Sequence, residues 1–384
     1  MKPANNTTDS LNGPEGTPPR VGESLGRDAW RQFRKNRVAN FSLYFLISIL
    51  LLAVFTPVLP LQSPQVQHLG DKKRGIPSKQ FRAPNLQPHR LEMVDAESTR
   101  TPLSKVISDG NSTSDPILQI WNDPGRLDQL LIRVRLAIFG DWSMPSICGS
   151  DHLGRDILSR LFWGARVSLA VGIIAALVSL VIGVLYGAVA GFQGGSLDNL
   201  MMRFVDVLYS VPFIFVVIFL VTILSEESIK QTLLTYGVDQ ITIFYIVIGA
   251  IYWLTMARVV RGQVISIKNE LFVESARACG ASHTSILIRH IIPNVISVVI
   301  VYLTLTIPSV MLFEAFLSFL GLGVEPPNVS WGLLANDGIQ AITPIRIHWW
   351  LVLFPGLALS TTLLALNFLG DGLRDALDPK MNNR

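Results

Sequence analysis

Six long stretches of this sequence contain no Asp, Glu, Lys or Arg, and they constrain the fold more than any other feature. The stretches are residues 40–70, 167–197, 207–225, 240–257, 290–313 and 347–370. An apolar helix of about 20 residues is long enough to cross the hydrocarbon core of a bilayer. Because 49% of the residues are hydrophobic and only 16% are charged, a single soluble domain is excluded. We predict an all-α membrane protein with six transmembrane helices.

The Lys and Arg residues are distributed unevenly between the two sides that six alternating helices define. Sixteen lie on the side of the two termini, whereas the short loops opposite carry one each, Lys230 and Arg346. Short loops rich in Lys and Arg stay in the cytoplasm, and long segments translocate largely regardless of charge. We therefore expect both termini in the cytoplasm. Residues 1–37 lack the apolar stretch of a signal peptide, so the first helix is expected to be an uncleaved anchor.

Composition divides the chain into four parts. Residues 1–24 are rich in Asn, Thr, Gly and Pro and are expected to be a disordered tail. Residues 25–61 contain the first span, preceded at 28–40 by an interfacial helix or only by a positive flank. Residues 62–147 form a long external insertion, and residues 148–384 contain helices 2–6.

The external insertion begins with a stretch that is too polar to pack a core by itself, so most of it should be irregular. Its later part differs, because Asp123 followed by Pro124 is typical of a helix start. The apolar residues that follow recur at helical spacing: Leu127, Leu130, Leu131, Val134 and Ile138. We expect an amphipathic helix there, lying on the outer membrane face or against the other helices.

Glycine and proline mark packing and bending sites within the predicted spans. Gly183, Gly187 and Gly191 form two overlapping GxxxG steps on one face of helix 2. They predict close helix packing or, alternatively, a contact that slides during transport. Pro212 predicts a kink in helix 3, and Pro293 with Pro308 indicates that helix 5 is not straight.

Residues 274–293 lie on the cytoplasmic side between helices 4 and 5 and predict a helix, a break and a second helix. Gly280 can adopt the left-handed conformation that ends a helix, and Ser282 can cap the next one. A hairpin this short, with small residues, has no apolar core of its own. We interpret it as a rigid knob that docks into a partner.

The hairpin resembles the EAA loop of ABC importer permeases, which we place at residues 261–294. The family pattern is EAA, three residues, Gly, nine residues and then IxLP. Five residues fall at its positions, with Ser as the second one: Glu274, Ser275, Ala276, Gly280 and Pro293. The resemblance implies that ATPase subunits dock on this loop.

Residues 149–169, 314–323 and 367–379 resemble one branch of that family, the C-type permease subunit of dipeptide and oligopeptide ABC importers. The likeness covers residues 28–61 and 148–384 and leaves most of 62–147 without a role. It implies a permease subunit in the inner membrane of a bacterium. The transported solute would be a peptide or, as in close relatives, nickel or glutathione.

The same resemblance implies the partners. A second, related permease would enclose the peptide path together with this chain, two cytoplasmic ATPases would bind ATP and Mg²⁺, and an external binding protein would deliver the substrate. We expect no cofactor in this chain. Nucleic acid is not an expected partner, because the Lys and Arg residues form no basic stripe interleaved with aromatics.

Charged residues near the spans are the remaining candidates for sites. Asp151, Arg155, Asp156 and Arg160 either anchor an interfacial helix or contact an external binding protein or gate. Glu314 is costly within an apolar stretch, so it either lines the path or a gate or forms structural hydrogen bonds. Arg203 and Asp206, three apart, are expected to form a local ion pair. Cys148 and Cys279 fall on opposite sides of the membrane, which excludes a disulfide and a metal cluster.

The sequence lacks the motifs of an enzyme. It contains no Gly-Lys pair for a phosphate-binding loop, no HExxH and no nucleophile elbow. Any ATP hydrolysis must therefore come from separate subunits. An ion-coupled secondary transporter is the first alternative, but it would need more intramembrane ionisable groups than Glu314 alone. A membrane enzyme is the second, and it would need a clustered acid, base or nucleophile.

Overall fold

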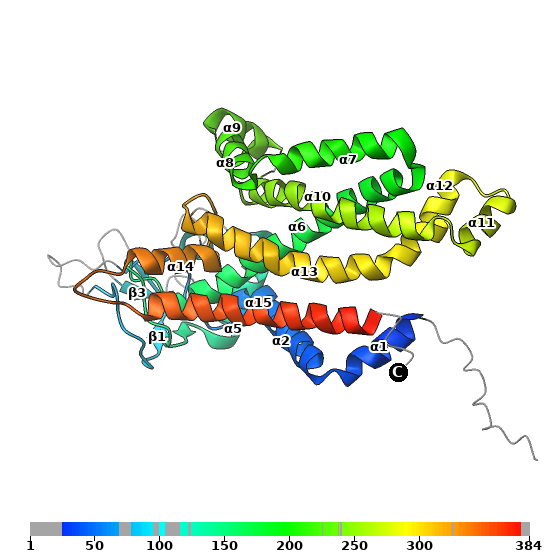
Figure 1. The fold of residues 1–384 in the computed structure, drawn as a ribbon. Coiled ribbons are helices and arrows are strands. Elements are labelled where there is room, and N and C mark those ends of the chain that lie inside the picture. The colour runs from blue at the N-terminus through cyan, green and yellow to red at the C-terminus, as the bar shows by residue number, and fades with distance from the viewer. Residues whose placement is uncertain are drawn as a thin grey trace, which may run out of the picture.

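The computed structural model describes residues 25–68, 78–94, 100–103, 116–121, 124–224, 226–236, 238, 240–324 and 326–377. They form a bundle of long helices with short strands at one end (Figure 1). The helices α1 (Leu25–Lys35), α11 (Leu271–Ala278) and α12 (His283–Ile286) lie at the opposite end. The predicted disordered tail, residues 1–24, lies outside the described residues.

Five helices among the described residues are long and apolar enough to cross a membrane. They are α2 (Arg37–Val54), α6 (Ile157–Gln193), α10 (Gln240–Ile267), α13 (Ile292–Phe319) with the turns before it, and α15 (Trp350–Leu377). Each coincides with one of the charge-free stretches, because only apolar side chains can face hydrocarbon along a whole span. The mostly helical fold is therefore as predicted.

The sixth predicted span, 207–225, is not one straight helix. Instead α7 (Gly195–Ser210) and α8 (Phe213–Leu224) are bent by 82°. Val211 between them is extended, with φ −80° and ψ 126°. Pro212 explains this, since it disfavours helical geometry in the preceding residue and has no N–H to donate. The expected kink is thus a break, and the described chain has five spans, or six if the bent pair counts as one.

Three glycines bring α6 close to α10. A Cβ atom at Gly187 would lie 2.3 Å from the backbone oxygen of Ala257. Cβ atoms at Gly183 and Gly191 would lie 2.6 and 2.8 Å from atoms of α10. Only residues without a side chain allow backbones to approach this closely. The structure places these glycines at the contact between α6 and α10.

A separate helix, α1, precedes the first span, α2. α1 ends at Lys35, and the Asn36 side chain then accepts hydrogen bonds from the amides of Val38 and Ala39, both at 3.1 Å, which caps α2. Phe33 is buried against Ala39 and α15. The N-terminal segment is therefore packed on the bundle and is more than a positive flank.

The described part of the external insertion contains more structure than the sequence predicted. After the turn η1 (Thr56–Val58), β1 (His89–Arg90) pairs with β4 (Trp142–Ser143), and β2 (Glu92–Val94) pairs with β3 (Arg100–Pro102), both antiparallel. α4 (Pro116–Trp121) and α5 (Arg126–Phe139) follow β3. Apolar residues of α4, α5 and the segments beside the strands form a small buried cluster: Leu91, Leu103, Ile117, Ile120, Trp121 and Ile132. The expectation that most of this segment is irregular is therefore only partly right, because scattered apolar residues gather into this cluster.

The predicted amphipathic helix of the insertion is α5, but it begins later than expected. Its N-cap residue is Gly125, which makes no side-chain cap bond. Asp123 lies outside the described residues, and Pro124 precedes the helix. Asp-Pro is therefore not the start of this helix.

Candidate functional site

The predicted docking hairpin consists of α11 and α12, which project beyond the ends of α10 and α13 (Figure 1). Between the two short helices Gly280 has a φ of 80°. The Ser282 hydroxyl accepts a hydrogen bond from the Ser285 amide at 3.3 Å and caps α12. A positive φ is easy for glycine and strained for residues with a Cβ. The hairpin thus has the local geometry that the sequence suggested, and its docking role remains a prediction.

The inner face of the hairpin is packed on the bundle. Val273 and Ala276 of α11 and Ile286 of α12 are buried. They belong to one cluster with apolar residues of α6, α10 and α13: Val184, Ala188, Met256, Val260, Val264, Val295 and Val299. The hairpin therefore shares one buried core with three spans.

The outer face of the hairpin is exposed and has a mixed chemistry. Glu274 and Ser275 are exposed, whereas Ala276 points inward. Leu271 is 79% exposed and Phe272 is 40% exposed. Sequence reasoning did not single out these two apolar residues. The sequence offered no signal for them, because their exposure depends on which side of α11 packs against the bundle.

A π-helical turn, Leu287–Ile291, connects the hairpin to α13. Pro293 stands in the first turn of α13, where it cannot donate the usual backbone hydrogen bond. The Asn294 side chain donates to the backbone oxygen of His290, four residues earlier, at 2.6 Å. The irregularity expected near Pro293 is therefore the π-helical turn beside the hairpin. Pro308 lies within α13, which continues to Phe319.

Two polar contacts hold the base of the hairpin. Arg261 of α10 donates two hydrogen bonds to the Asp198 carboxylate of α7, at 2.6 and 2.7 Å. The Lys268 ammonium, at the end of α10, donates to the backbone oxygen of Gly191 at 3.1 Å. Such bidentate and charge-assisted bonds fix orientation as well as distance. They tie the ends of α6, α7 and α10 into one support.

Glu314 is fully buried between helices and does not line an open path in this structure. The hydroxyl of Ser318 donates to its carboxylate at 2.8 Å, and that of Ser168, in α6, does so at 3.4 Å. Ser168 also accepts from the amide of Trp331, the first residue of α14 (Trp331–Gln340), at 3.0 Å. Of the two sequence alternatives, this geometry favours the structural one, in which Glu314 links α6, α13 and α14.

The charged residues at the start of α6 are turned inward, which favours the anchoring alternative over contact with an external binding protein or gate. Arg160 donates to Asp151 at 2.7 Å and to Asp337 of α14 at 3.2 Å. Arg155 also donates to Asp151, at 2.7 Å. Asp156 caps α6 by accepting from the Ser159 amide at 2.8 Å. Because Asp151, Asp156 and Arg160 are almost fully buried, they join α14 to the start of α6 and are not available to a partner.

Burial also changes the protonation of Asp156, which lies just outside the span. Removal from water raises the pKa of this carboxyl to about 7, although the Ser159 amide acts in the opposite direction. The same cause raises the pKa of the neighbouring Cys148 thiol to about 12. Neither Cys148 nor Cys279 forms a disulfide. Cys148 is buried, whereas Cys279 is exposed.

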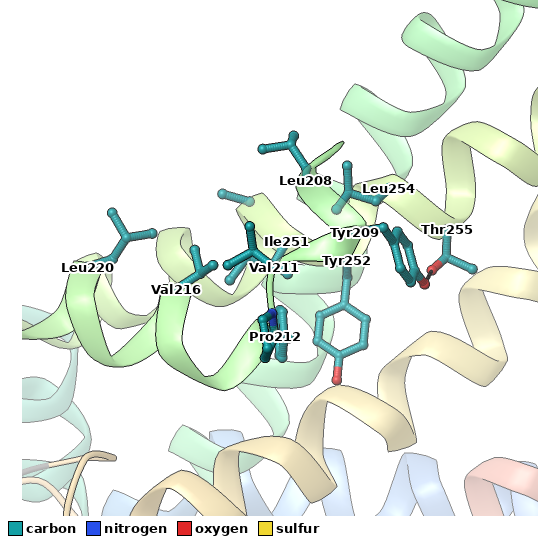
Figure 2. Close-up of a pocket in the computed structure, with 12 residues that line it drawn as sticks. Leu208, Tyr209, Val211, Pro212, Val216, Leu220, Ile251, Tyr252, Leu254 and Thr255 are labelled. Atoms are coloured by element: carbon teal, nitrogen blue, oxygen red, sulfur yellow. Dashed lines mark hydrogen bonds between the residues drawn. The ribbon is translucent and has the colours of Figure 1, made fainter. Parts of the chain in front are cut away.

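An apolar groove of about 400 Å³ lies where the break between α7 and α8 faces α10. Figure 2 shows Pro212, Val216 and Leu220 along it, and Tyr209 hydrogen-bonded to Thr255 at its end. The hydroxyl oxygens of Tyr209 and Thr255 are 2.9 Å apart.

The predicted local ion pair near this groove is replaced by a longer-range one. Asp206 accepts a hydrogen bond from Arg258 of α10 at 2.7 Å, instead of pairing with Arg203. The Arg258 guanidinium also lies 4.1 Å from the centre of the Tyr209 ring. Arg258 contacts both a carboxylate and an aromatic ring, so it gains more interaction energy than Arg203 would gain from Asp206 alone.

The fold and these surfaces define a helical membrane protein whose spans support a projecting two-helix knob. Residues 183–383 match the family of binding-protein-dependent transport system inner membrane components. Residues 24–88 match the N-terminal transmembrane domain of oligopeptide transport permease C. The chain therefore belongs to the family of binding-protein-dependent transport system inner membrane components, and it is a multi-pass permease of the inner membrane.

Three relatives illustrate the similarity. The oligopeptide transport system permease protein OppC of Haemophilus influenzae is 47% identical over 249 residues, which cover 62% of this chain and 75% of that protein. The dipeptide transport system permease protein DppC of Bacillus subtilis is 35% identical over 358 residues, which cover 93% of this chain and 87% of that protein. The glutathione transport system permease protein GsiD of Pectobacterium atrosepticum is 40% identical over 235 residues, covering 61% and 73%.

Proposed function

We propose that this chain is one of two permease subunits of an ATP-driven importer of peptides. The observation that carries the proposal is the hairpin, which is seated on three spans by buried residues and exposes Leu271 and Phe272 beside Glu274. Exposed apolar residues next to a charge, on a rigid element, are typical of a docking surface. Its partner is a cytoplasmic ATPase subunit, and two such subunits serve the two permeases.

The ATPases supply the chemistry that this chain does not. They bind ATP and Mg²⁺, and closing of the ATPase pair moves the hairpin. Because Val273 and Ile286 share one buried cluster with α6, α10 and α13, that movement reaches the spans without an intervening flexible loop. The chain itself carries no cofactor and catalyses no reaction.

The second permease covers the face formed by α7, α8 and α10. Large apolar side chains are exposed there: Leu200, Phe204, Val207, Tyr209, Val211, Phe215 and Phe219. The groove of about 400 Å³ and the Asp206–Arg258 pair lie on the same face. Charges within or beside spans avoid lipid and face protein or water. A related subunit on this face would enclose the transport path between the two permeases.

The orientation follows from the same proposal. α1 and the hairpin lie at one end of the bundle, and the strands of the external insertion lie at the other (Figure 1). An ATPase at the hairpin places that end, with both termini, in the cytoplasm. A substrate-binding protein then delivers the solute at the end that carries the strands.

Peptides are the proposed substrate because relatives from the oligopeptide and dipeptide systems align with 62% and 93% of this chain. Glutathione, itself a small peptide, is the second candidate, since a glutathione system permease is 40% identical. Competition by unlabelled oligopeptides, dipeptides, glutathione and nickel against labelled peptide uptake distinguishes these solutes.

The docking proposal is tested in the reconstituted complex. Phe272→Asp should reduce substrate-stimulated ATP hydrolysis and peptide uptake together, because it places a charge in the apolar contact. Trp30→Asp is the matched control, since Trp30 is an exposed aromatic residue of α1, outside the loop and at the same end of the bundle (Figure 1). Normal stimulation in Phe272→Asp, or an equal loss in both variants, would contradict docking through the face of α11.

A further inference from the structure

α5, in the external insertion, exposes its apolar side. Leu127, Leu130 and Ile138 are 68, 61 and 63% exposed, and Val134 between them is also exposed. The residues that α5 buries against the rest of the chain are Ile132 and Arg135. An amphipathic helix at a water-facing surface would be arranged the opposite way. Something apolar must therefore cover this side of α5.

The circumference of α5 has three sectors. At about 100° per residue, Leu127, Leu130, Val134 and Ile138 fall in one arc, whereas Ile132 and Arg135 fall in the arc that faces the protein. The third arc contains exposed Arg126 and Arg133. A helix that faces protein, apolar material and water at once has the pattern of a helix lying in a membrane interface.

Two contacts fix the level of α5 relative to the spans. Arg166 of α6 donates to both oxygens of Asp128, at 2.8 and 2.9 Å. Arg166 is the last charged residue before the stretch 167–197, so it marks the edge of the hydrocarbon region. It also lies 4.9 Å from the centre of the Trp163 ring, and tryptophan is common at that edge.

The second contact is at the end of another span. Arg135 of α5 donates to the backbone oxygen of Leu59, at 3.3 Å, and to that of Trp142, at 3.1 Å. Leu59 follows η1, directly after α2, and α5 packs against η1. Asp128 and Arg135 are seven residues apart, or about 10 Å along the helix. α5 is thus held at the edges of two spans, α6 and α2.

The end of α2, next to which α5 packs through η1, also exposes apolar side chains. Near its end α2 exposes Leu51, Val54 and Phe55. Trp142, directly after α5, is exposed as well. We infer that the Leu127, Leu130, Val134 and Ile138 face of α5 lies in the bilayer, at the boundary of headgroups and acyl chains in the leaflet next to the external insertion. This inference rests on the membrane location of the chain and not on the peptide or ATPase proposals.

Membrane contact here would give the insertion a mechanical role. α5 contributes Ile132 to the buried cluster that contains Leu91 of the insertion and Ile117 of α4. Lipid on one side of α5 and this cluster on the other hold the insertion at a fixed height above the spans. The bilayer thus becomes part of the support for the external insertion.

The inference is tested by nitroxide labelling of the complete complex in phospholipid vesicles. Cys279→Ser leaves Cys148, which is buried, as the remaining native cysteine. Single cysteines are then placed at Leu127, Val134 and Ile138, with Leu86→Cys as the control, because Leu86 is an exposed leucine of the same insertion outside any helix. Collisions with oxygen, which concentrates in lipid, are compared with collisions with a water-soluble nickel chelate.

Labels at Leu127, Val134 and Ile138 should meet oxygen several-fold more often than nickel, and the ratio should be reversed at Leu86. A label at Ala137, which lies between the apolar and the Arg arcs, should give an intermediate ratio. Frequent nickel collisions at the three apolar positions would show that the face is in water and would overturn the inference. Protection from both reagents would show that a protein covers α5 and would overturn it equally.

Discussion

The cytoplasmic hairpin and the external insertion both project from the same spans, yet they are attached by different chemistry. The hairpin is seated by buried Val273, Ala276 and Ile286. The external end adds ion pairs to its apolar clusters: Arg160 contacts Asp151 and Asp337 beside α14, and Arg166 contacts Asp128 of the insertion. Apolar contacts are nondirectional, whereas hydrogen-bonded ion pairs hold one geometry.

This difference fits the two proposed roles. A coupling element must transmit movement, and an apolar seat allows a small shift without leaving a buried charge unpaired. The external region supports delivery of the substrate, for which a fixed arrangement of α14, α5 and the start of α6 is suited. The following variants test this contrast, from the largest expected effect to the smallest.

Loss of the central external arginine should have the largest effect. Arg160→Met leaves Asp151 and Asp337 without their buried partner, and breaking a buried ion pair costs about 3–5 kcal/mol of stability. We expect a lower melting temperature in detergent and faster hydrogen exchange in residues 149–160. Arg126→Met, at an exposed arginine, should change stability by less than about 0.5 kcal/mol. Similar melting of both variants would show that the network does not hold the external region.

The buried carboxyl of Asp156 should make the external region sensitive to pH. Its folded pKa is about 7, above the ordinary 3.8, so the folded state binds the proton more tightly. The contribution of this carboxyl to stability is therefore fully present below about pH 4, and it is lost as the pH rises through about 7.

Asp156→Asn keeps an N-cap acceptor for α6 but removes this titration. The stability of this variant relative to the unchanged protein should rise between pH 5 and pH 8 by about 3 kcal/mol, since this interval spans about two pKa units of the shift and one unit corresponds to about 1.4 kcal/mol. Melting curves at both pH values measure the difference. Asp371→Asn, at an exposed position, should show no such rise. A pH-independent difference for Asp156→Asn would contradict the assignment.

On the hairpin, Gly280→Val should disturb coupling more than stability. No atom lies within 4 Å of a Cβ at this site, so the cost comes from the φ of 80° and is about 1–2 kcal/mol. Substrate-stimulated ATP hydrolysis should fall while membrane insertion stays normal. Gly280→Asn is the control, because Asn accepts the left-handed conformation more readily. Undiminished stimulation by Gly280→Val would refute the geometry of the break.

Charge reversal at Glu274 should have the smallest effect. If the partner presents a cation there, Glu274→Lys weakens retention of the ATPase, more so at low salt because screening acts beyond about 10 Å at 0.1 M. Retention of the ATPase by Glu274→Gln should lie between that of the unchanged protein and that of Glu274→Lys. Retention of the ATPase during purification at two salt concentrations measures the effect. Full retention of Glu274→Lys at both would exclude an electrostatic contact.

The spans and the hairpin break could be predicted because each depends on local sequence. A charge-free stretch needs only a bilayer, and the φ of Gly280 and the cap at Ser282 need only the neighbouring residues. The GxxxG glycines also identified a packing face, although not the helix that packs on it. The sequence did not predict that Pro212 separates two helices.

Long-range partners could not be predicted from spacing. Asp206 pairs with Arg258, 52 residues away, and Arg160 reaches Asp337, 177 residues away. Both choices depend on how the helices assemble, so the ion pair between Asp206 and the nearer Arg203 was the wrong expectation, and the contact of Arg160 with Asp337 was not foreseen. Leu271 and Phe272 were missed for a related reason, since their exposure follows from which side of α11 meets the bundle.

The central claim is that the exposed face of α11 contacts an ATPase subunit, and site-specific photocrosslinking tests it most directly. A photoreactive amino acid replaces Phe272 in the assembled complex, and a second sample carries it at Leu86 in the external insertion. The account predicts a covalent adduct with the ATPase from position 272 and none from position 86. An intact complex that gives no ATPase adduct from position 272 would contradict it.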